Sequence, residues 1–455
     1  MAKKKGASAS PFVPVDEQPY PIPENWCWVR LGKLYEINPK VTADNAVLAS
    51  FVPMERIESG MTGRFTFEIQ SWEKARKNHT QFADGDVAFA KISPCFENQK
   101  SMIVQGLTNG IGGGTTELII LRQAHMNQKY TFLLISTEDF ISQGKATYSG
   151  TVGQQRISMD FVKAYSVPVP PLPEQHRIVS RIESLFAKLD EAKEKAQAVV
   201  DGFELRKSAI LHKAFTGELT EKWRKEHGVG LDSWVYSPWG NLIMSIEAGK
   251  NWSAEGRPPE DSEFGVVKVS AVTWGEFNEL ESKTCTLNEQ WNEKTQIHEG
   301  DFLFSRANTL QLVGNCVIVK NIGRRLMLSD KILRFSFDKS VVPEYILYFT
   351  HSDLYRRQIE QLASGNQDGM RNVSQKNIKS VEFPVPLLFE QKEIVRIIGN
   401  LYDKEQRAKS AAEAVLTQID TMKKSILARA FRGELGTNDP AEESAAELIK
   451  SICSN

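Results

Sequence analysis

The chain carries one sequence pattern twice, at a fixed separation. Residues 168–175 read Pro-Val-Pro-Pro-Leu-Pro-Glu-Gln and residues 384–391 read Pro-Val-Pro-Leu-Leu-Phe-Glu-Gln, so the second copy follows the first by 384 − 168 = 216 positions. The same separation relates Ala-Phe-Thr-Gly-Glu-Leu at 214–219 to Ala-Phe-Arg-Gly-Glu-Leu at 430–435. A register kept over this length indicates two copies of one structural unit, which present two similar surfaces to a partner of roughly two-fold symmetry.

Length and composition restrict the class of protein. A chain of 455 residues with 41% hydrophobic and 25% charged side chains is expected to form several globular domains. No apolar run reaches the ~18–20 residues of a membrane span. The formal net charge of −1 means that a nucleic-acid reader would need its Lys and Arg gathered on one face. The cysteines are odd in number and lack metal-ligand spacing, which indicates reduced thiols in a cytoplasmic protein: Cys27, Cys95, Cys285, Cys316 and Cys453.

A long stretch of helical periodicity follows each Pro-rich segment. Apolar side chains recur at alternating steps of four and three residues, from Ile178 to Ile210 in the first copy and from Ile394 to Ile426 in the second. This is a heptad seam sustained over more than four repeats, which predicts coiled-coil helices. About 40 residues of helix span roughly 60 Å. Gly217 and Gly433 are suited to end these helices.

Two charged breaks in the seams indicate the direction of helix pairing. Arg206 interrupts the first seam and Glu405 the second, where copy one has Leu189. Parallel pairing at equal height would leave both charges against apolar side chains, whereas antiparallel pairing about a centre between Ala196 and Val199 brings Arg206 to Glu405. An unpaired buried charge costs ~3–5 kcal/mol. The sequence therefore predicts an antiparallel coiled coil with an Arg206–Glu405 latch; the alternative is two separate surface helices on different domains.

The stretches between the helices also correspond, which predicts two related α/β domains. Gly-Asp-Val-Ala-Phe-Ala-Lys at 85–91 matches Gly-Asp-Phe-Leu-Phe-Ser-Arg at 300–306, and each predicts a turn, a short buried strand and a terminal cation. Residues 130–140 and 345–355 both predict helix. Between such landmarks the two halves differ almost everywhere, as two readers of different targets would.

A search for catalytic motifs finds none that holds. There is no GxxxxGK[ST] sequence, and Gly110–Thr115 has threonine where GxGxxG requires its last glycine. No HExxH or Cys/His zinc spacing is present, nor is Asn-Pro-Pro-Tyr or Asp-Pro-Pro-Tyr. The sequence therefore favours a binding protein over an enzyme.

Polar loops recur at equivalent places in both halves. Arg, Lys, Asn and Gln match base edges in the major groove, and glycine-rich loops let backbone N–H groups approach phosphates. A single such loop would be interpreted as a solvated surface loop, but recurrence in both halves favours DNA contact. The candidate DNA-contacting residues are Lys91, Ser93, Asn98, Gln99, Lys100, Gln154, Gln155 and Arg156 in the first half, and Arg306, Asn308, Thr309, Gln311, Asn366, Gln367, Arg371 and Asn372 in the second.

These features together resemble the specificity subunit of Type I restriction-modification systems. The resemblance runs from about Trp26 to Leu435 and rests on the Pro-x-Pro-xxx-Glu-Gln segments and the long helices that end in Ala-Phe-x-Gly-Glu-Leu. Its most specific parts are residues 170–175, 390–395 and 425–435, with Glu-Leu-Thr-Glu-Lys-Trp-Arg at 218–224.

The resemblance implies a non-catalytic, sequence-specific DNA-binding subunit. Each half would be a target recognition domain for one part of a split, asymmetric site in double-stranded DNA. The coiled coil would set the unread spacer and dock two modification subunits, which carry S-adenosylmethionine and methylate adenine; two restriction subunits would add ATP- and Mg-dependent cleavage. No cofactor or metal is expected in this chain. The alternatives are a coiled-coil scaffold that does not read DNA, and a DNA-modifying enzyme that acts alone.

The expected fold is mixed α/β with a pseudo-two-fold internal repeat. The expected order is a disordered basic leader (1–23), a first recognition domain (24–172), a central long helix (173–220), a second recognition domain (221–388), a distal long helix (389–436) and a short acidic tail (437–455).

Overall fold

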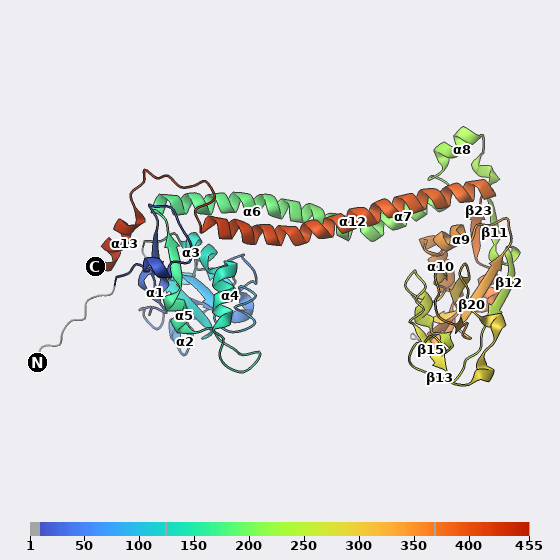
Figure 1. Ribbon diagram of the computed structural model, residues 1–455, viewed down its shortest axis with the longest axis horizontal. Coiled ribbons are helices and arrows are strands. Elements are labelled where there is room, and N and C mark those ends of the chain that lie inside the picture. The colour runs from blue at the N-terminus through green and yellow to red at the C-terminus, as the bar shows by residue number, and fades with distance from the viewer. Residues whose placement is uncertain (1–9, 123–124, 368–369, 455) are drawn as a thin grey trace, which may run out of the picture. The chain divides into compact units, whose positions relative to one another are not determined.

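The structure is a computed structural model that describes residues 10–122, 125–367 and 370–454 (Figure 1). The chain divides into two compact units, which are described in turn. Unit 1 comprises Met1–Ala196 and Ala414–Asn455, and unit 2 comprises Gln197–Glu413. Each unit therefore contains a globular domain together with parts of both long helices.

The strands of unit 1 form an antiparallel sheet and a mixed sheet. The antiparallel sheet has the order β2-β9-β6-β7, and the mixed sheet has the order β4-β3-β8-β5 with β3 and β8 parallel. A separate ribbon pairs β1 with β10. The strands are β1 (Cys27–Arg30), β2 (Glu36–Ile37), β3 (Leu48–Val52), β4 (Glu68–Ser71), β5 (Thr80–Ala83), β6 (Val87–Ala90), β7 (Ser101–Ile103), β8 (Ile111–Gly114), β9 (Leu118–Arg122) and β10 (Ser166–Val169).

Three helices of unit 1 begin at side-chain caps. Asn127, Thr137 and Ser158 each accept a backbone N–H of the first helical turn that follows. Phe89 of β6 packs edge-on against Phe140 in the main core. The helices are α1 (Leu31–Leu34), α2 (Trp72–Arg76), α3 (Gln128–Ile135), α4 (Glu138–Ala146), α5 (Met159–Ala164), α6 (Leu172–Asp201), the end of α12 (Leu388–Ala430) and α13 (Ala445–Ser454).

Unit 2 repeats this sheet arrangement with a different edge. Its antiparallel sheet is β12-β20-β16-β18 and its mixed sheet is β13-β15-β14-β19, with β14 and β19 parallel. In unit 1 the edge strand β5 lies beside β8, whereas in unit 2 the edge strand β13 lies beside β15. Further sheets are β11-β23 and β17-β22-β21. The strands are β11 (Val235–Pro238), β12 (Ile243–Ala248), β13 (Ala254–Glu255), β14 (Gly265–Val267), β15 (Ser282–Cys285), β16 (Phe302–Ser305), β17 (Ala307–Asn308), β18 (Cys316–Ile318), β19 (Leu326–Met327), β20 (Ile332–Phe337), β21 (Ser364–Gln367), β22 (Met370–Asn372) and β23 (Glu382–Val385).

The helices of unit 2 keep the repeat, but the single helices expected over 130–140 and 345–355 are each divided in two, with breaks at 136–137 and 351–352. Helix α9 (Pro343–Thr350) begins and ends 215 positions after α3, and β16 stands in the same relation to β6. Helix α12 begins 216 positions after α6. The predicted α/β class and internal repeat are therefore present in the fold. The other helices of this unit are α7 (Phe203–Phe215), α8 (Glu221–His227), α10 (Asp353–Leu362) and α11 (Gln375–Lys379).

The long helices pair in antiparallel fashion within each unit. In unit 1, α6 runs beside the end of α12 (Figure 1), and Lys423 donates to Asp190 at 2.5 Å while Lys193 lies 3.8 Å from Asp420. The residue number rises on one helix as it falls on the other, as antiparallel pairing requires. In unit 2, α7 pairs with the first part of α12, and Arg206 Nε donates to Glu405 Oε2 at 2.6 Å. The contact expected from the two seam breaks is thus observed.

The first long helix is shorter and less regular than the sequence predicts. A continuous helix over 173–220 was expected, but α6 ends at Asp201, Gly202 intervenes, and α7 ends at Phe215. The Arg206 guanidinium accounts for the break, because its Nη2 donates to the Val199 carbonyl at 2.7 Å, where an uninterrupted helix would bond the N–H of Phe203. A Cβ added to Gly202 would lie only 2.5 Å from Arg206 Nη1.

We predict that breaking the latch weakens unit 2 by about 1 kcal/mol, because the Arg206 and Glu405 side chains remain 37% and 23% exposed. Arg206→Met and Glu405→Met should each destabilise the chain, and a double-mutant cycle by urea unfolding should give a coupling energy of that size. Lys195→Met, which removes an exposed pair with Glu191 on α6, is the control and should change stability by less than about 0.5 kcal/mol. Additive single effects would show that the pair does not contribute.

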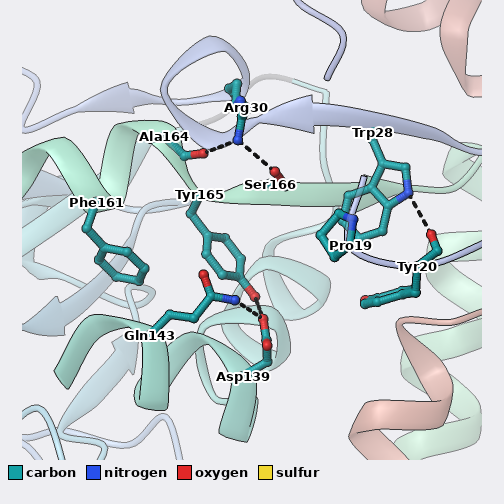
Figure 2. A pocket seen from close by; sticks show the side chains of 10 residues that line it. All are labelled: Pro19, Tyr20, Trp28, Arg30, Asp139, Gln143, Phe161, Ala164, Tyr165 and Ser166. Atoms are coloured by element: carbon teal, nitrogen blue, oxygen red, sulfur yellow. Dashed lines mark hydrogen bonds between the residues drawn. The ribbon is translucent and has the colours of Figure 1, made fainter. Parts of the chain in front are cut away.

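The N-terminal segment is more ordered than expected. Residues 1–9 of the predicted leader lie outside the described residues, but 10–23 pack on unit 1, where Val13 is 3% exposed and donates its N–H to Trp28. Tyr20 and Trp28 line a cavity of about 150 Å³ together with Asp139, which accepts from Tyr165 and Gln143 (Figure 2). Burial raises the pKa of the Tyr165 hydroxyl well above its ordinary value, with Asp139 adding to the rise. The cavity is lined by Pro19, Tyr20, Trp28, Arg30, Asp139, Gln143, Phe161, Ala164, Tyr165 and Ser166.

The C-terminal segment also packs on unit 1. Arg177 of α6 makes two hydrogen bonds to the Glu442 carboxylate, at 2.7 and 2.8 Å. Ala445 and Ile449 of α13 are buried in the unit 1 core. The short acidic tail expected at 437–455 therefore contains a helix that buries apolar side chains.

The repeated Glu-Gln pair in the first turn of each long helix is fully buried. Glu174 accepts from the indole of Trp26 at 2.8 Å and from Asn438 at 2.9 Å. Glu390 accepts from the indole of Trp234 and from Arg224, both at 2.9 Å. Each glutamate thus binds a segment that follows the other long helix, within its own unit.

The neighbouring glutamines fix the domains to the helices. Gln175 Oε1 accepts the N–H of Asn127, which caps α3, and Gln391 Oε1 accepts the N–H of Val342 before α9. Their Nε2 groups donate to the carbonyls of Pro170 and Pro386. This explains why the Glu-Gln pair recurs in both copies of the repeat.

Candidate nucleic-acid interface

The first group of candidate residues lies on a loop that has the same length in both units. We call this the hairpin loop: residues 91–100 between β6 and β7, and residues 306–315 between β16 and β18. Its ends are closed alike, by Ala90 N–H on the Lys100 carbonyl and by Ser305 N–H on the Asn315 carbonyl, each at 2.9 Å. The residue before the closing residue, Gln99 in unit 1 and Gly314 in unit 2, has positive φ.

The second group lies on a loop that pairs with the hairpin loop. We call this the glycine loop, residues 149–156 and 364–372. Ser93 N–H donates to the Gln155 carbonyl in unit 1, and Asn308 pairs with Arg371 at the equivalent place in unit 2. The two candidate loops of each half, separate in sequence, are therefore adjacent in the fold.

A third segment, which is not among the sequence-predicted residues, contacts the hairpin loop. This is the glycine turn, residues 58–60 in unit 1 and 273–275 in unit 2. Gly60 N–H donates to the Asn98 carbonyl at 2.8 Å, and the Thr273 carbonyl accepts from the Asn315 side chain at 2.8 Å. Gly60 and Gly275 have φ of 83° and 86° and stand 215 positions apart, a signal that could have identified the turn. We call the three segments of each unit its tip cluster.

The tip cluster lies at one end of the antiparallel sheet, and in unit 2 the start of α12 lies toward the other end. In unit 2, β16 runs into the hairpin loop and β20 begins next to it, since Arg306 N–H donates to the Lys331 carbonyl. The opposite end of β20 leads to Ser340, whose carbonyl accepts from Gln391 at the start of α12. In unit 1, Lys91 N–H donates likewise to the Glu117 carbonyl.

In unit 1, Arg156 is held by an acidic neighbour. Its Nε and Nη2 donate to the two carboxylate oxygens of Glu117 at 2.9 and 2.7 Å, and its Nη1 donates to the Gln154 carbonyl. The Arg156 hydrogen bonds hold the pKa of the Glu117 carboxyl below its ordinary value. An ion pair whose arginine is 43% exposed contributes little, about 0–1 kcal/mol. Glu117 therefore orients the Arg156 side chain but holds it only weakly.

The other unit 1 candidates differ in accessibility. Asn98 and Gln154 are exposed, Lys91 and Gln155 are half-buried, and Ser93 is 8% exposed. Two candidates are bound to their own unit instead of facing outward. Gln99 donates to the Ser136 carbonyl and Lys100 to the Met54 carbonyl.

In unit 2, some candidates are hydrogen-bonded within the unit and others are exposed. Asn308 donates to the Thr273 hydroxyl and accepts the N–H of Thr309, and Arg371 donates to the Gly365 carbonyl at 2.5 Å. Gln311 and Asn372 are exposed, and Arg306 and Thr309 are half-buried. Asn366 and Gln367 lie in β21, beside β22.

The part of the chain that the structure describes has no group of three or more His, Cys, Asp or Glu side chains that could hold a metal ion. None of the helices in these described ranges is long and apolar enough to cross a membrane. The geometry at the tip clusters is that of paired loops that carry hydrogen-bonding side chains.

The architecture is similar to that of known proteins. The HsdS subunit from Thermoanaerobacter tengcongensis has the same fold, with a TM-score of 0.65 at 20% identity over 92% of this chain and 99% of that chain. Among curated proteins, the Type I restriction enzyme EcoEI specificity subunit of Escherichia coli is 28% identical over 90% of this chain and 83% of its own length. The EcoAI specificity subunit of Escherichia coli is 36% identical over 50% of this chain and 39% of its own length.

The sequence profile of the Type I restriction modification DNA specificity domain matches residues 23–200 and 260–415. These ranges include the hairpin and glycine loops of both units and most of both long helices. Since the matches cover well over half of the chain and fall once on each copy of the repeat, the chain belongs to the family of Type I restriction modification DNA specificity proteins.

Proposed function

We propose that this chain is the DNA-sequence specificity subunit of a Type I restriction-modification complex. Each unit reads one part of a bipartite, asymmetric site in double-stranded DNA through its tip cluster. The chain performs no chemistry itself, and it directs methylation and cleavage by its partners to the site that it reads.

The observation that carries this proposal is the repeated convergence of two loops on one common frame. The hairpin and glycine loops meet by equivalent backbone bonds in both units, but the side chains that they present differ. Arg156 and Gln154 stand in unit 1 where unit 2 has Asn372 and Met370. A shared frame with unlike Arg, Asn and Gln side chains is suited to two different sets of base edges.

Family membership and the names of the relatives support the following set of partners. The long helices dock two modification subunits, which supply S-adenosylmethionine and methylate adenine, and two restriction subunits supply the ATP- and Mg-dependent nuclease. The antiparallel pairing of the long helices supports a role as the spacer between the two half-sites. Cations of the modification subunits compensate for the near-neutral charge of this chain on DNA.

The test is to map methylated adenines in DNA from cells that carry the chain with its modification subunits. We expect a split motif with two specified parts and an unspecified spacer. Arg156→Ala should relax the specified bases of one part only, and Arg371→Ala those of the other part only, by about 1–3 kcal/mol of discrimination each.

Lys339→Ala is the matched control for Arg371→Ala. Lys339 is an exposed cation in unit 2 that follows the opposite end of β20 from the tip cluster, and its loss should leave the motif unchanged. A purified complex that protects no DNA would favour the scaffold alternative. Methyl transfer to DNA by the chain alone would favour the enzyme alternative.

A further inference from the structure

The tip cluster of unit 2 exposes three large apolar side chains. Trp274 is 76% exposed on the glycine turn, Leu310 is 37% exposed on the hairpin loop, and Met370 is 45% exposed on the glycine loop. Each segment of the cluster thus contributes one of them. Apolar groups gathered at a surface and interleaved with polar residues indicate a binding site.

All three lie close to Asn308. Leu310 is two residues further along the hairpin loop. Met370 precedes Arg371, which is the ladder partner of Asn308. Trp274 follows Thr273, whose hydroxyl accepts from the Asn308 side chain at 3.3 Å.

The frame of the cluster does not require these side chains. The equivalent positions in unit 1 are Ser59, Cys95 and Gln154, at separations of 215, 215 and 216 residues. The hairpin and glycine loops nevertheless pair by equivalent backbone bonds in the two units, so the apolar side chains are suited to what unit 2 contacts and are not needed to hold the two loops together. Unit 1 also exposes an apolar side chain, Val152, but its counterpart Asp368 lies outside the described residues.

The turn that carries Trp274 is well anchored. Thr273 is 5% exposed, donates its hydroxyl to the Val269 carbonyl, and accepts the Asn315 side chain on its own carbonyl. The indole is therefore presented from a fixed base, which limits the conformational entropy lost on binding. Glu276, two residues on, disfavours a phosphate as the neighbour of Trp274, although Lys320 partly compensates its charge at 3.3 Å. The edge of a base is the better contact.

In the major groove, the C5-methyl group of thymine is the apolar feature of a base pair, and the adenine of the same pair offers N7 and N6 to an Asn or Gln side chain. On the basis of the proposed function, we propose that unit 2 reads thymine methyl groups through Trp274, Leu310 and Met370. We call these residues the apolar triad. Asn372 is exposed beside Arg371 on the glycine loop, where it can bind the adenine of the same pair.

The experiment compares thymine with deoxyuridine, which lacks only the methyl group. The full chain, in complex with its modification subunits, is titrated with duplexes that carry the mapped site. Thymines are replaced by deoxyuridine only in the half-site whose specificity Arg371→Ala relaxes. Each contacted thymine should lower affinity by about fourfold when its methyl group is removed, the equivalent of ~0.8 kcal/mol per buried carbon.

The triple variant W274S/L310C/M370Q, which installs the residues of unit 1, is the matched test. It should bind thymine and deoxyuridine duplexes equally in this half-site, while the ratio for the other half-site stays as in the wild type. The substituted side chains are exposed, so thermal unfolding should be unchanged; if the variant unfolds, the wild-type comparison alone decides.

The outcomes separate this inference from the proposed function. Sequence-specific binding that is indifferent to the thymine methyl groups, or a unit 2 half-site without thymine, overturns the triad proposal and leaves the specificity role intact. Absence of any sequence-specific binding overturns the proposed function itself.

Discussion

Arg224→Met is expected to destabilise unit 2 by about 3–5 kcal/mol, because it leaves the Glu390 carboxylate buried without its cation. Arg224 Nη1 donates to Glu390 Oε1 at 2.9 Å, and the two side chains are 7% and 0% exposed. The Trp234 indole and the Thr220 hydroxyl remain as donors to the carboxylate, but both are neutral. Urea-induced unfolding of the full chain would measure the loss.

Lys225→Met is the control on the same helix. Lys225 pairs with Glu221 at 2.7 Å, but the two side chains are 75% and 60% exposed, so the change should be less than about 0.5 kcal/mol. Both substitutions remove one cation from α8 and keep an unbranched side chain. Equal effects of the two would mean that the Arg224–Glu390 pair contributes no more than a surface pair.

Phe215→Ala should also cost unit 2 about 3–5 kcal/mol, because it removes a large buried ring and leaves a cavity. Phe215 is 1% exposed, and its ring packs at 5.3 Å from that of Tyr345 and 5.2 Å from that of Phe349. The Tyr345 hydroxyl donates to the Pro384 carbonyl, so one aromatic group connects the end of α7, helix α9 and strand β23. Urea unfolding followed by near-ultraviolet circular dichroism would report the loss of this packing.

Phe389→Ala provides the comparison at an exposed ring. Phe389 is 49% exposed at the start of α12 and contacts Trp223 at 5.5 Å. Its removal should cost less than about 1 kcal/mol, because little buried surface is lost. A Phe215 effect as small as this would contradict the assignment of Phe215 to the structural core of the repeat.

The sequence predicted those parts of the fold that depend on local periodicity. The heptad seams, the strand after Gly85-Asp86 and its counterpart, and the antiparallel pairing could all be inferred from spacing along the chain. The Arg206–Glu405 contact could be predicted because each residue is the charged break in its own seam. The sequence could not predict that Arg206 would also bond the Val199 carbonyl and interrupt its own helix.

The parts that the sequence missed depend on contacts between distant segments. The hydrogen-bond partners of Glu174 and Glu390, such as Asn438 and Arg224, come from segments far away in sequence. Within the candidate interface, the polar loops were identified by composition. The pairing of Arg156 with Glu117 was not, because Glu117 precedes β9 and has no equivalent in unit 2, where Lys331 takes its place.

The equal length of the hairpin loop in the two units has a consequence for how recognition diversifies. Residues 91–100 and 306–315 have the same length and are closed by equivalent backbone bonds, although the residue types differ at all ten positions. By contrast, the segment between β11 and the glycine turn of unit 2 is longer than the segment between β1 and the glycine turn of unit 1. Under the proposed function, a lineage can acquire a new DNA target by exchanging side chains on an inherited hairpin frame, one substitution at a time, without passing through a misfolded intermediate.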